Sequence, residues 1–254
     1  MLERILESTR GRLPDLRSRS DELTRRAQEV PPPPSFRDAL AGEGIAVIAE
    51  VKRRSPSRGD LAPDLDPGEV ARRYASGGAS AISVLTEPEF FAGSPADLTA
   101  VATTGLPVLR KDFILDPVQV WEAKVIGASA LLLIVAALDD GELRRLLTEA
   151  DDAGLDVLVE VHTDDEARRA VEAGSRIVGV NNRDLADFSV DLATAEKLAP
   201  LLVDAPLRVA ESGVFSGADA ARMADAGYDA VLVGEALVKA SDPAALLYEL
   251  RAGR

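Results

Sequence analysis

The sequence contains no cysteine and a single histidine, His162. Without cysteine, the chain can form no disulfide framework, no Cys₂His₂ zinc site and no cysteine nucleophile. Any catalytic triad that needs a histidine would have to use His162. Acid–base chemistry must therefore fall mainly to carboxylates and lysines.

The chain is also poor in basic residues and has no long hydrophobic run. In 254 residues, 43 Asp and Glu outnumber 29 Lys and Arg, which gives a formal charge of −14. Because nonspecific nucleic-acid binding needs a basic face, this charge argues against a nucleic-acid partner. The longest apolar run, Ala128–Leu138, is far shorter than the roughly 20 residues of a membrane span. The start mixes Glu and Arg with no apolar stretch, which predicts no secretion signal, no membrane partner and a cytoplasmic protein.

Short apolar runs alternate with longer amphipathic segments from Ile45 onward. The runs predict strands at Ala46–Val51, Ala81–Leu85, Pro107–Leu109, Ala130–Val135, Val157–Val161, Ile177–Val180, Leu207–Ala210 and Ala230–Val233. The intervening segments predict helices at Pro67–Ser76, Pro95–Thr103, Pro117–Ile126, Asp140–Ala153, Asp164–Ala173, Leu192–Leu198, Gly217–Ala226 and Pro243–Arg251. Nearly continuous apolar strands that helices connect indicate a parallel sheet covered by helices.

Eight such units favour an α/β fold of the closed (β/α)8 TIM-barrel type over an open, doubly wound sheet. No G-x-G-x-x-G motif follows the first predicted strand, although a dinucleotide-binding fold would often have one. Polar residues recur at the carboxyl ends of the strands, which is where TIM barrels build their active sites.

Residues 1–33 are expected to form an N-terminal helical extension, and residues 34–254 a single barrel domain. Apolar residues at helical spacing up to Leu23 predict short amphipathic helices, and Pro31–Pro34 end them in a stiff connector. The extension fits either a simple addition to the fold or a lid over the mouth of the barrel.

The first predicted strand ends in two charges. Period-two alternation places Glu50 and Lys52 on the face that points into the barrel. Taken alone, they fit a structural ion pair as well as a functional site. The following loop, Arg53–Gly59, adds arginines and hydroxyl groups. In so acidic a protein, this local positive charge fits an anionic ligand.

Two further strand ends carry a lysine and a glutamate. Lys111 shares its parity with Leu109, so an inward ammonium could act as a general acid, although a lysine extended to the surface fits equally. Glu160 lies in an apolar run, and because burying an unpaired carboxylate is costly, it should meet a cation such as Lys52 or Lys111. Glu160 is therefore the preferred general base. His162 is expected to be a rim or solvent-facing residue.

The last three strand ends offer donors and glycines. Asn181 and Arg183 share parity and supply a neutral and a charged donor. The segments Ala210–Val214 and Val233–Leu237 place glycine before a helix, where the backbone can approach a ligand and free N–H groups can bind an anion. Loops after strands seven and eight of TIM barrels frequently hold a phosphate. A phosphorylated small molecule is therefore the expected ligand.

Six of these stretches together resemble the indole-3-glycerol phosphate synthase family. They are Ile48–Ser57, Pro107–Ile114, Leu158–His162, Gly179–Leu185, Ala210–Val214 and Val233–Leu237. The similarity extends from Pro34 to the C-terminus, whereas the first 30 residues are similar only in being helical.

The resemblance implies a reaction and a set of residue roles. Members of the family close the indole ring of 1-(2-carboxyphenylamino)-1-deoxyribulose 5-phosphate, with loss of CO₂ and water, in tryptophan biosynthesis. By this resemblance Lys111 is the general acid acting on the substrate carbonyl, and Glu160 is the general base in dehydration. The other residues implied to act in catalysis are Glu50, Lys52 and Asn181. Those implied to bind substrate are Arg183, Ser55, Ser212, Gly213, Gly234 and Glu235, the last through its backbone N–H.

The resemblance implies neither a cofactor nor a metal. It also implies a monomer, and it leaves open a weak association with other enzymes of the tryptophan pathway. Two alternatives remain from the residues themselves. One is another phosphate-binding barrel enzyme, either a sugar-phosphate isomerase or an aldolase with Lys111 as a Schiff-base nucleophile. The other is a catalytically silent phosphate-binding protein.

Overall fold

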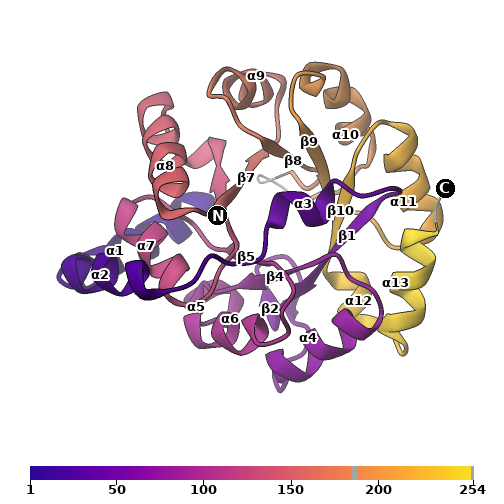
Figure 1. The fold of residues 1–254 in the computed structure, drawn as a ribbon. Coiled ribbons are helices and arrows are strands. Elements are labelled where there is room, and N and C mark those ends of the chain that lie inside the picture. The colour runs from indigo at the N-terminus through magenta and orange to yellow at the C-terminus, as the bar shows by residue number, and fades with distance from the viewer. Residues whose placement is uncertain (185–187, 253–254) are drawn as a thin grey trace.

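The computed structural model describes residues 1–184 and 188–252, and it is a closed barrel of eight parallel strands ringed by helices (Figure 1). The predicted TIM barrel is thus confirmed. Leu185, which belongs to one of the family-like stretches, and the last two residues of the predicted barrel domain lie outside the described residues. The boundary between residues 33 and 34 stays a prediction.

The barrel strands occur in the order in which the chain makes them. They are β1 (Ala46–Val51), β4 (Ala81–Leu85), β5 (Val108–Lys111), β6 (Ala130–Ile134), β7 (Asp156–Val161), β8 (Ile177–Asn181), β9 (Leu207–Glu211) and β10 (Ala230–Val233). Strand β10 pairs with β1 and closes the ring. Strand β5 extends two residues beyond the predicted end at Leu109, so Lys111 lies within the strand.

The strands alternate as their sequences predict. Alternate residues such as Ile48, Leu109, Leu158 and Leu232 form one buried cluster inside the barrel. The residues between them pack outward against the helices in a second, larger cluster. Because the two faces alternate with a period of two, the parity of each strand decides which of its polar side chains enter the barrel.

The outer helices follow the predicted segments within a few residues. They are α4 (Pro67–Ser76), α6 (Pro95–Ala102), α7 (Pro117–Val125), α8 (Asp140–Ala153), α9 (Asp164–Glu172), α10 (Ala193–Leu198), α11 (Gly217–Asp225) and α13 (Pro243–Arg251). The predicted starts at Asp116, Ser216 and Asp242 are confirmed, because each side chain accepts hydrogen bonds from the first turn of its helix.

Several short elements lack a clear pattern in the sequence. They are α3 (Phe36–Leu40), β2 (Arg54–Ser55), β3 (Gly59–Asp60), α5 (Pro88–Phe91), α12 (Glu235–Lys239) and the 3₁₀ helices η1 (Val135–Ala137) and η2 (Ala199–Leu202). Helix α3 has a clear packing role, because Phe36 and Leu40 join the cluster inside the barrel and cover its amino end. The other end of the barrel is left for a site.

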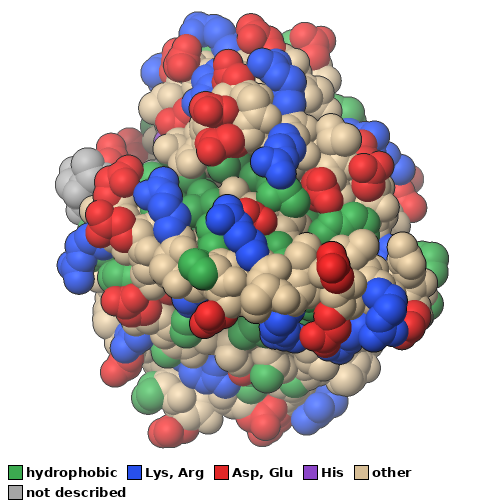
Figure 2. Space-filling view, turned by 90° about the vertical axis from the view of Figure 1, so that its left-hand side faces the viewer, with side chains coloured by type: hydrophobic (Ala, Val, Ile, Leu, Met, Phe, Trp, Pro, Cys, Tyr) green, Lys and Arg blue, Asp and Glu red, His purple; other side chains and the backbone are tan. Residues whose placement is uncertain are grey.

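The N-terminal helices α1 (Leu2–Arg17) and α2 (Ser20–Glu29) confirm the predicted amphipathic extension. They lie beside α7, and α2 packs directly against it (Figure 1). Acidic and basic side chains are interspersed over this side of the molecule (Figure 2). Across residues 1–184 and 188–252, no helix combines the length and the apolar character that crossing a membrane requires.

Candidate active site

One cavity at the carboxyl ends of the strands brings together every residue to which the family resemblance gives a role. Its lining includes Glu50, Lys52, Ser55, Lys111, Glu160, Asn181, Arg183, Ser212, Gly213, Gly234 and Glu235. These residues come from six strand ends that are far apart in sequence. Parallel strands in a closed ring explain the convergence, because all their carboxyl ends meet at the same opening.

Lys111 lies at the centre of the polar side chains. Its Nζ is 2.7 Å from Glu211 Oε2, 3.5 Å from Glu50 Oε2 and 4.0 Å from Glu160 Oε2. Lys111 is therefore the lysine that lies near Glu160, as the sequence predicted. The ammonium is thus held by carboxylates from three different strands, and the alternative of a surface lysine is excluded by this burial.

The surroundings of Lys111 keep it charged. Burial alone would lower the pKa of the Lys111 ammonium, but the carboxylates of Glu211, Glu50 and Glu160 outweigh burial and raise it. The side chain therefore carries its proton at any physiological pH. Because its pKa is raised, this ammonium gives up its proton only to a strongly basic acceptor, such as an oxygen that gains negative charge.

Glu50 joins two lysines. Its Oε1 accepts a hydrogen bond of 2.5 Å from Lys52, while its other oxygen faces Lys111. Burial would raise the pKa of Glu50, but the charges of Lys52 and Lys111 lower it below its usual value. Glu50 is therefore ionised, and it places both ammonium groups along one wall of the cavity.

Glu211 is the functional residue that the sequence reasoning missed. It is fully buried, and its Oε1 makes no hydrogen bond among the described residues. Burial raises the pKa of Glu211 to about 7, since the nearby Glu160 and Glu50 carboxylates oppose the attraction of Lys111. The signal was present: Glu211 shares the inward parity of Leu207 and Val209, as Glu160 shares that of Leu158.

Two glycines make room for the carboxylates. A Cβ at Gly179 would lie 2.3 Å from Glu211 Oε1, and a Cβ at Gly234 would lie 2.4 Å from Glu50 Oε1. Distances this short do not occur between real atoms, so a larger residue would displace the carboxylate. Gly234 was expected to bring the backbone close to a ligand. The structure adds that it also seats the Glu50–Lys52 pair.

The turn after β9 has a constrained backbone. Ser212 and Gly213 have φ angles of +64° and +84°, in the left-handed region that residues other than glycine rarely adopt. The Nδ2 of Asn182 holds this turn by donating to the carbonyl oxygens of Glu211 and Ser212, each at 3.1 Å. Strain of this kind persists where surrounding contacts enforce it, often at functional sites.

Glu235 faces two cations at the opposite rim. Its carboxylate lies 2.6 Å from Lys239 and 3.4 Å from Arg58. Burial would raise the pKa of Glu235, but the hydrogen bond from Lys239 and the charge of Arg58 lower it. Burial lowers the pKa of Arg183, and the nearby Arg58 adds to this effect. An anion placed here would relieve the repulsion between the two guanidinium groups.

The sequence predicted that the arginines of the first loop bring positive charge to the cavity, but two of them contact other segments instead. Arg53 pairs with Asp97 at 2.5 Å, and Arg54 donates to the carbonyl oxygen of Glu89 at 2.5 Å. These contacts fasten the loop to the segment that follows β4. Ser55, from the same loop, does line the cavity.

His162 is less exposed than the sequence suggested. Only 10% of its side-chain surface is accessible, and its ring lies between the carboxylates of Glu160 and Glu166. The prediction that His162 faces solvent is therefore wrong. The first turn of α9 lies against this position, where Glu166 accepts a hydrogen bond from the His162 backbone N–H.

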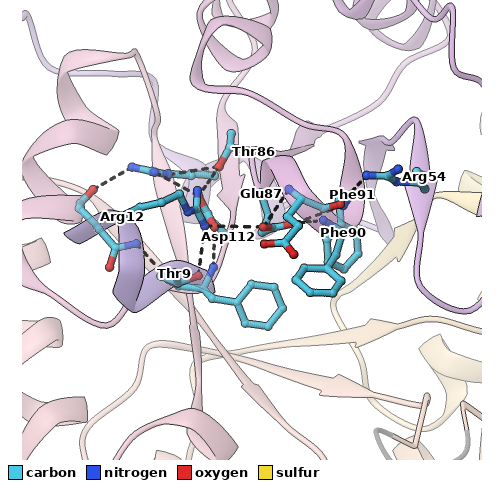
Figure 3. Close-up of polar contacts among 12 residues, drawn as sticks. Thr9, Arg12, Arg54, Thr86, Glu87, Phe90, Phe91 and Asp112 are labelled. Atoms are coloured by element: carbon cyan, nitrogen blue, oxygen red, sulfur yellow. Dashed lines mark hydrogen bonds and ion pairs between the residues drawn. The ribbon is translucent and has the colours of Figure 1, made fainter. Parts of the chain in front are cut away.

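The N-terminal helix reaches the mouth of the cavity, where Met1, Leu2 and Ile5 form part of the lining. Arg12 on this helix lies 3.7 Å from the buried Glu87, and Figure 3 shows the two residues on facing segments. Arg17 makes a 2.6 Å ion pair with Asp116. Helix α1 is thus held over the loops that follow β4 and β5.

Glu87 also shapes the apolar wall of the cavity. Its oxygens accept hydrogen bonds from the backbone N–H groups of Glu89, Phe90 and Phe91, which form the single turn α5 (Figure 3). Phe91 packs against Phe113 with ring centroids 6.2 Å apart. Both rings line the cavity, so it offers a flat apolar surface beside the charged wall.

No group of three or more His, Asp or Glu side chains in the described part of the chain has the spacing of a metal site. The carboxylates of Glu50, Glu160 and Glu211 surround an ammonium group instead. What the arrangement can do chemically is to donate and accept protons at the centre of the cavity and bind an anion at its rim.

Comparison with solved structures concerns the barrel fold. A 3-hexulose-6-phosphate synthase aligns with a TM-score of 0.64 and 21% identity, covering 82% of this chain and 99% of that one. A mandelate oxidase aligns with a TM-score of 0.62 and 19% identity, covering 81% of this chain and 72% of the other. At such identities the likeness concerns the fold alone.

Sequence comparison is more specific. The indole-3-glycerol phosphate synthase family model matches residues 2–250. An indole-3-glycerol phosphate synthase of Opitutus terrae is 52% identical over 239 residues, which span 91% of this chain and 90% of the relative. One from Streptomyces griseus is 49% identical over 253 residues, or 98% and 94% of the two chains. The chain belongs to the indole-3-glycerol phosphate synthase family.

Proposed function

We propose that Lys111 is the general acid and Glu160 the general base of ring closure in this protein. As a member of its family, the chain is a carboxy-lyase of tryptophan biosynthesis. It converts 1-(2-carboxyphenylamino)-1-deoxyribulose 5-phosphate into indole-3-glycerol phosphate, with loss of CO₂ and water. Glu50, Lys52 and Asn181 assist, while Arg183, Ser55, Ser212, Gly213, Gly234 and Glu235 bind the substrate.

One observation carries the assignment of roles. The ammonium of Lys111 lies 4.0 Å from the carboxylate of Glu160, with Glu50 and Glu211 on its other sides. A donor and an acceptor of protons therefore face the same small volume. General acid–base catalysis needs this proximity before it needs a matched pKa.

Ring closure uses the donor first. Attack of the aromatic carbon on the ketone gives its oxygen negative charge, and an alkoxide is basic enough to take a proton even from an ammonium whose pKa is raised. CO₂ then leaves, and the new hydroxyl departs as water when an acid gives it a proton and a base removes a proton from the neighbouring ring carbon. Glu160, whose Oε2 is 4.0 Å from Lys111, would act as this base.

The reaction as a whole consumes one proton. The carboxylate leaves as neutral CO₂, and the ketone oxygen leaves as water with two protons, of which the substrate supplies one. Lys111 must therefore be recharged from solvent in each turnover. Glu211, whose pKa is raised to about 7 and whose Oε2 is 2.7 Å from Lys111, suits the role of proton reserve.

The two ends of the cavity fit the two ends of the substrate. The rings of Phe91 and Phe113 suit the aromatic ring. The glycine turns at Gly213 and Gly234, with Arg183 nearby, suit the phosphate. The carboxylate of Glu235 is engaged by Lys239 and Arg58, which leaves its backbone N–H as the group that would contact an anion.

The oligomeric state, the cellular location and the association with other enzymes are also part of the proposal. We expect a monomer in the cytoplasm that associates at most weakly with other enzymes of the tryptophan pathway. Sedimentation at several concentrations would check the monomer. A mass that rises with concentration would contradict it.

A direct assay tests the proposed function. The purified chain, given the carboxyphenylamino substrate, is expected to form indoleglycerol phosphate, seen by the fluorescence of the indole ring. Absence of this product would overturn the proposal. Borohydride trapping distinguishes the aldolase alternative, because only a Schiff base on Lys111 would yield a stable covalent adduct.

Glu211→Gln is expected to change how stability depends on pH. The pKa of Glu211 is about 7 in the folded chain against an ordinary 4.5, so the folded state keeps a proton that the unfolded state has lost. Wild-type stability should therefore fall as pH rises through this window. The variant lacks this ionisation, and its Tm relative to wild type should rise from about pH 5 to about pH 7.5.

Glu235→Gln is the matched control for this measurement, because Glu160 and Glu50, and not Glu235, are the carboxylates that raise the pKa of Glu211. The pKa of Glu235 is lowered, so its contribution to stability is complete above about pH 5 and is lost only in more acidic solution. Its Tm difference from wild type should therefore stay level over the same range. Parallel curves for wild type and Glu211→Gln would show that Glu211 does not titrate near neutrality.

A further inference from the structure

His162, the single histidine of the chain, lies between two carboxylates at the end of β7. Its Nδ1 is 3.3 Å from Glu166 Oε2, and the same oxygen accepts a 2.8 Å hydrogen bond from the His162 backbone N–H. Its Nε2 is 3.4 Å from Glu160 Oε1. Glu166 thus fixes the ring from one side, and the ring faces the proposed base on the other.

The atom that faces Glu160 is unusual. His162 Nε2 is buried and makes no hydrogen bond among the described residues. Buried polar atoms without a hydrogen-bond partner are rare in proteins, and those that occur often have a functional role. On the opposite side of the same carboxylate, Glu160 Oε2 lies 4.0 Å from Lys111. Glu160 is therefore held between an ammonium and an imidazole.

We propose that His162 is a positioning residue for Glu160. Its ring, anchored by Glu166, orients the Glu160 carboxylate across from Lys111 and places positive charge beside it when the ring is protonated. This inference rests on the proposed role of Glu160 as the base. It adds that the position of this base is controlled from helix α9, outside the cavity wall.

The charges around the ring support a protonated imidazole. Glu160 on β7, Glu166 on α9 and Glu211 on β9 all face it, and no cation is among the groups that act on it. Burial would lower the pKa of His162, but the hydrogen bond to Glu166 and the charges of these carboxylates raise it. In return, His162 lowers the pKa of Glu166 against the effect of burial.

The first test is the titration of His162 itself. Because the chain has one histidine, its ring signals in NMR of the untagged protein need no assignment. In wild type the midpoint should lie above 6.5, the ordinary value. In Glu160→Gln, which removes one neighbouring charge, it should fall by about half a pH unit or more. An unchanged midpoint would contradict the proposal, and the result does not depend on activity.

The second test is the pH profile of kcat/KM in His162→Gln, which keeps a polar side chain but cannot become positive. Without the charged ring, the Glu160 carboxylate loses the group that holds it across from Lys111, so activity should fall by about tenfold where the wild-type ring is charged. The loss should shrink at alkaline pH, where the wild-type ring is neutral. KM should change little. A profile that overlays wild type would overturn the inference.

Two further variants separate positioning from mere support of α9. Glu166→Gln removes the anchor of the ring and should lower activity in the same way, by less. Thr163→Ala removes the hydroxyl that accepts from the Glu166 backbone N–H, so it should lower Tm but leave the pH profile of activity in place. An equal loss of activity in Thr163→Ala would contradict a specific role for His162. Wild-type turnover in Glu160→Gln would instead refute the proposed function.

Discussion

Replacing Lys111 by alanine is expected to abolish formation of the indole ring while a phosphate ligand still binds. Lys111 is the ammonium within reach of Glu160, Glu50 and Glu211, so its loss removes both the donated proton and the positive charge beside the developing alkoxide. Each of these effects contributes about 10²-fold or more to rates in well-studied enzymes. The expected loss in kcat is therefore about 10³- to 10⁴-fold.

The substitution should not destroy the fold. Removing one partner of a buried pair can cost about 3–5 kcal/mol, but Glu211 can take up a proton because its pKa is already about 7. The cost should therefore be at the low end. Circular dichroism checks the fold, and Lys111→Met offers a second variant that keeps the apolar stem of the side chain.

Product fluorescence measures the chemistry, and calorimetry with inorganic phosphate measures the anion site. The glycine turns follow β9 and β10, whereas Lys111 lies on β5, so phosphate binding should remain. Lys111→Arg should keep the charge but fail to restore activity, because a guanidinium does not readily give up its proton. Wild-type rates in Lys111→Ala would refute the role of the acid.

Glu160→Gln is expected to produce the second largest loss, about 10²- to 10⁴-fold in kcat with little change in KM. Glutamine has the shape of glutamate but cannot accept the proton that dehydration releases. Ring closure and loss of CO₂ precede this step, so the variant should release CO₂ in a single turnover without forming indole. The accumulated intermediate should be heavier than the product by one water.

Rapid quenching with mass spectrometry would detect this intermediate. Glu149→Gln is the matched control. Glu149 is a partly buried glutamate that accepts a 2.6 Å hydrogen bond from Trp121, but it lies outside the cavity. It should retain full activity. Simultaneous loss of CO₂ release and indole formation in Glu160→Gln would mean that Glu160 acts before dehydration.

Parity along single strands was enough to place several site residues. Glu50 and Lys52 follow Ile48 with a period of two, and Lys111 follows Leu109, so a buried apolar neighbour marks each as inward. The same parity marks Glu211 as inward, because it follows Val209 with a period of two.

Contacts across the barrel could not be predicted in the same way. Lys111 and Glu211 are 100 positions apart, and their 2.7 Å contact exists only because β5 and β9 face each other in a closed ring. The clearance that Gly179 gives Glu211 is equally nonlocal. The arginines at 53 and 54 show the reverse: their charge was visible, but their partners on the next loop were not.

The sequence by itself determined the barrel, its strands and the residues at its mouth, because periodicity, caps and strand ends are local properties of the chain. Only the tertiary structure decided which charges pair, that His162 turns inward beside Glu160, and that α1 covers the opening. Those features depend on distances between segments far apart in the chain. Such distances follow from how the strands close into a ring, and no local pattern encodes them.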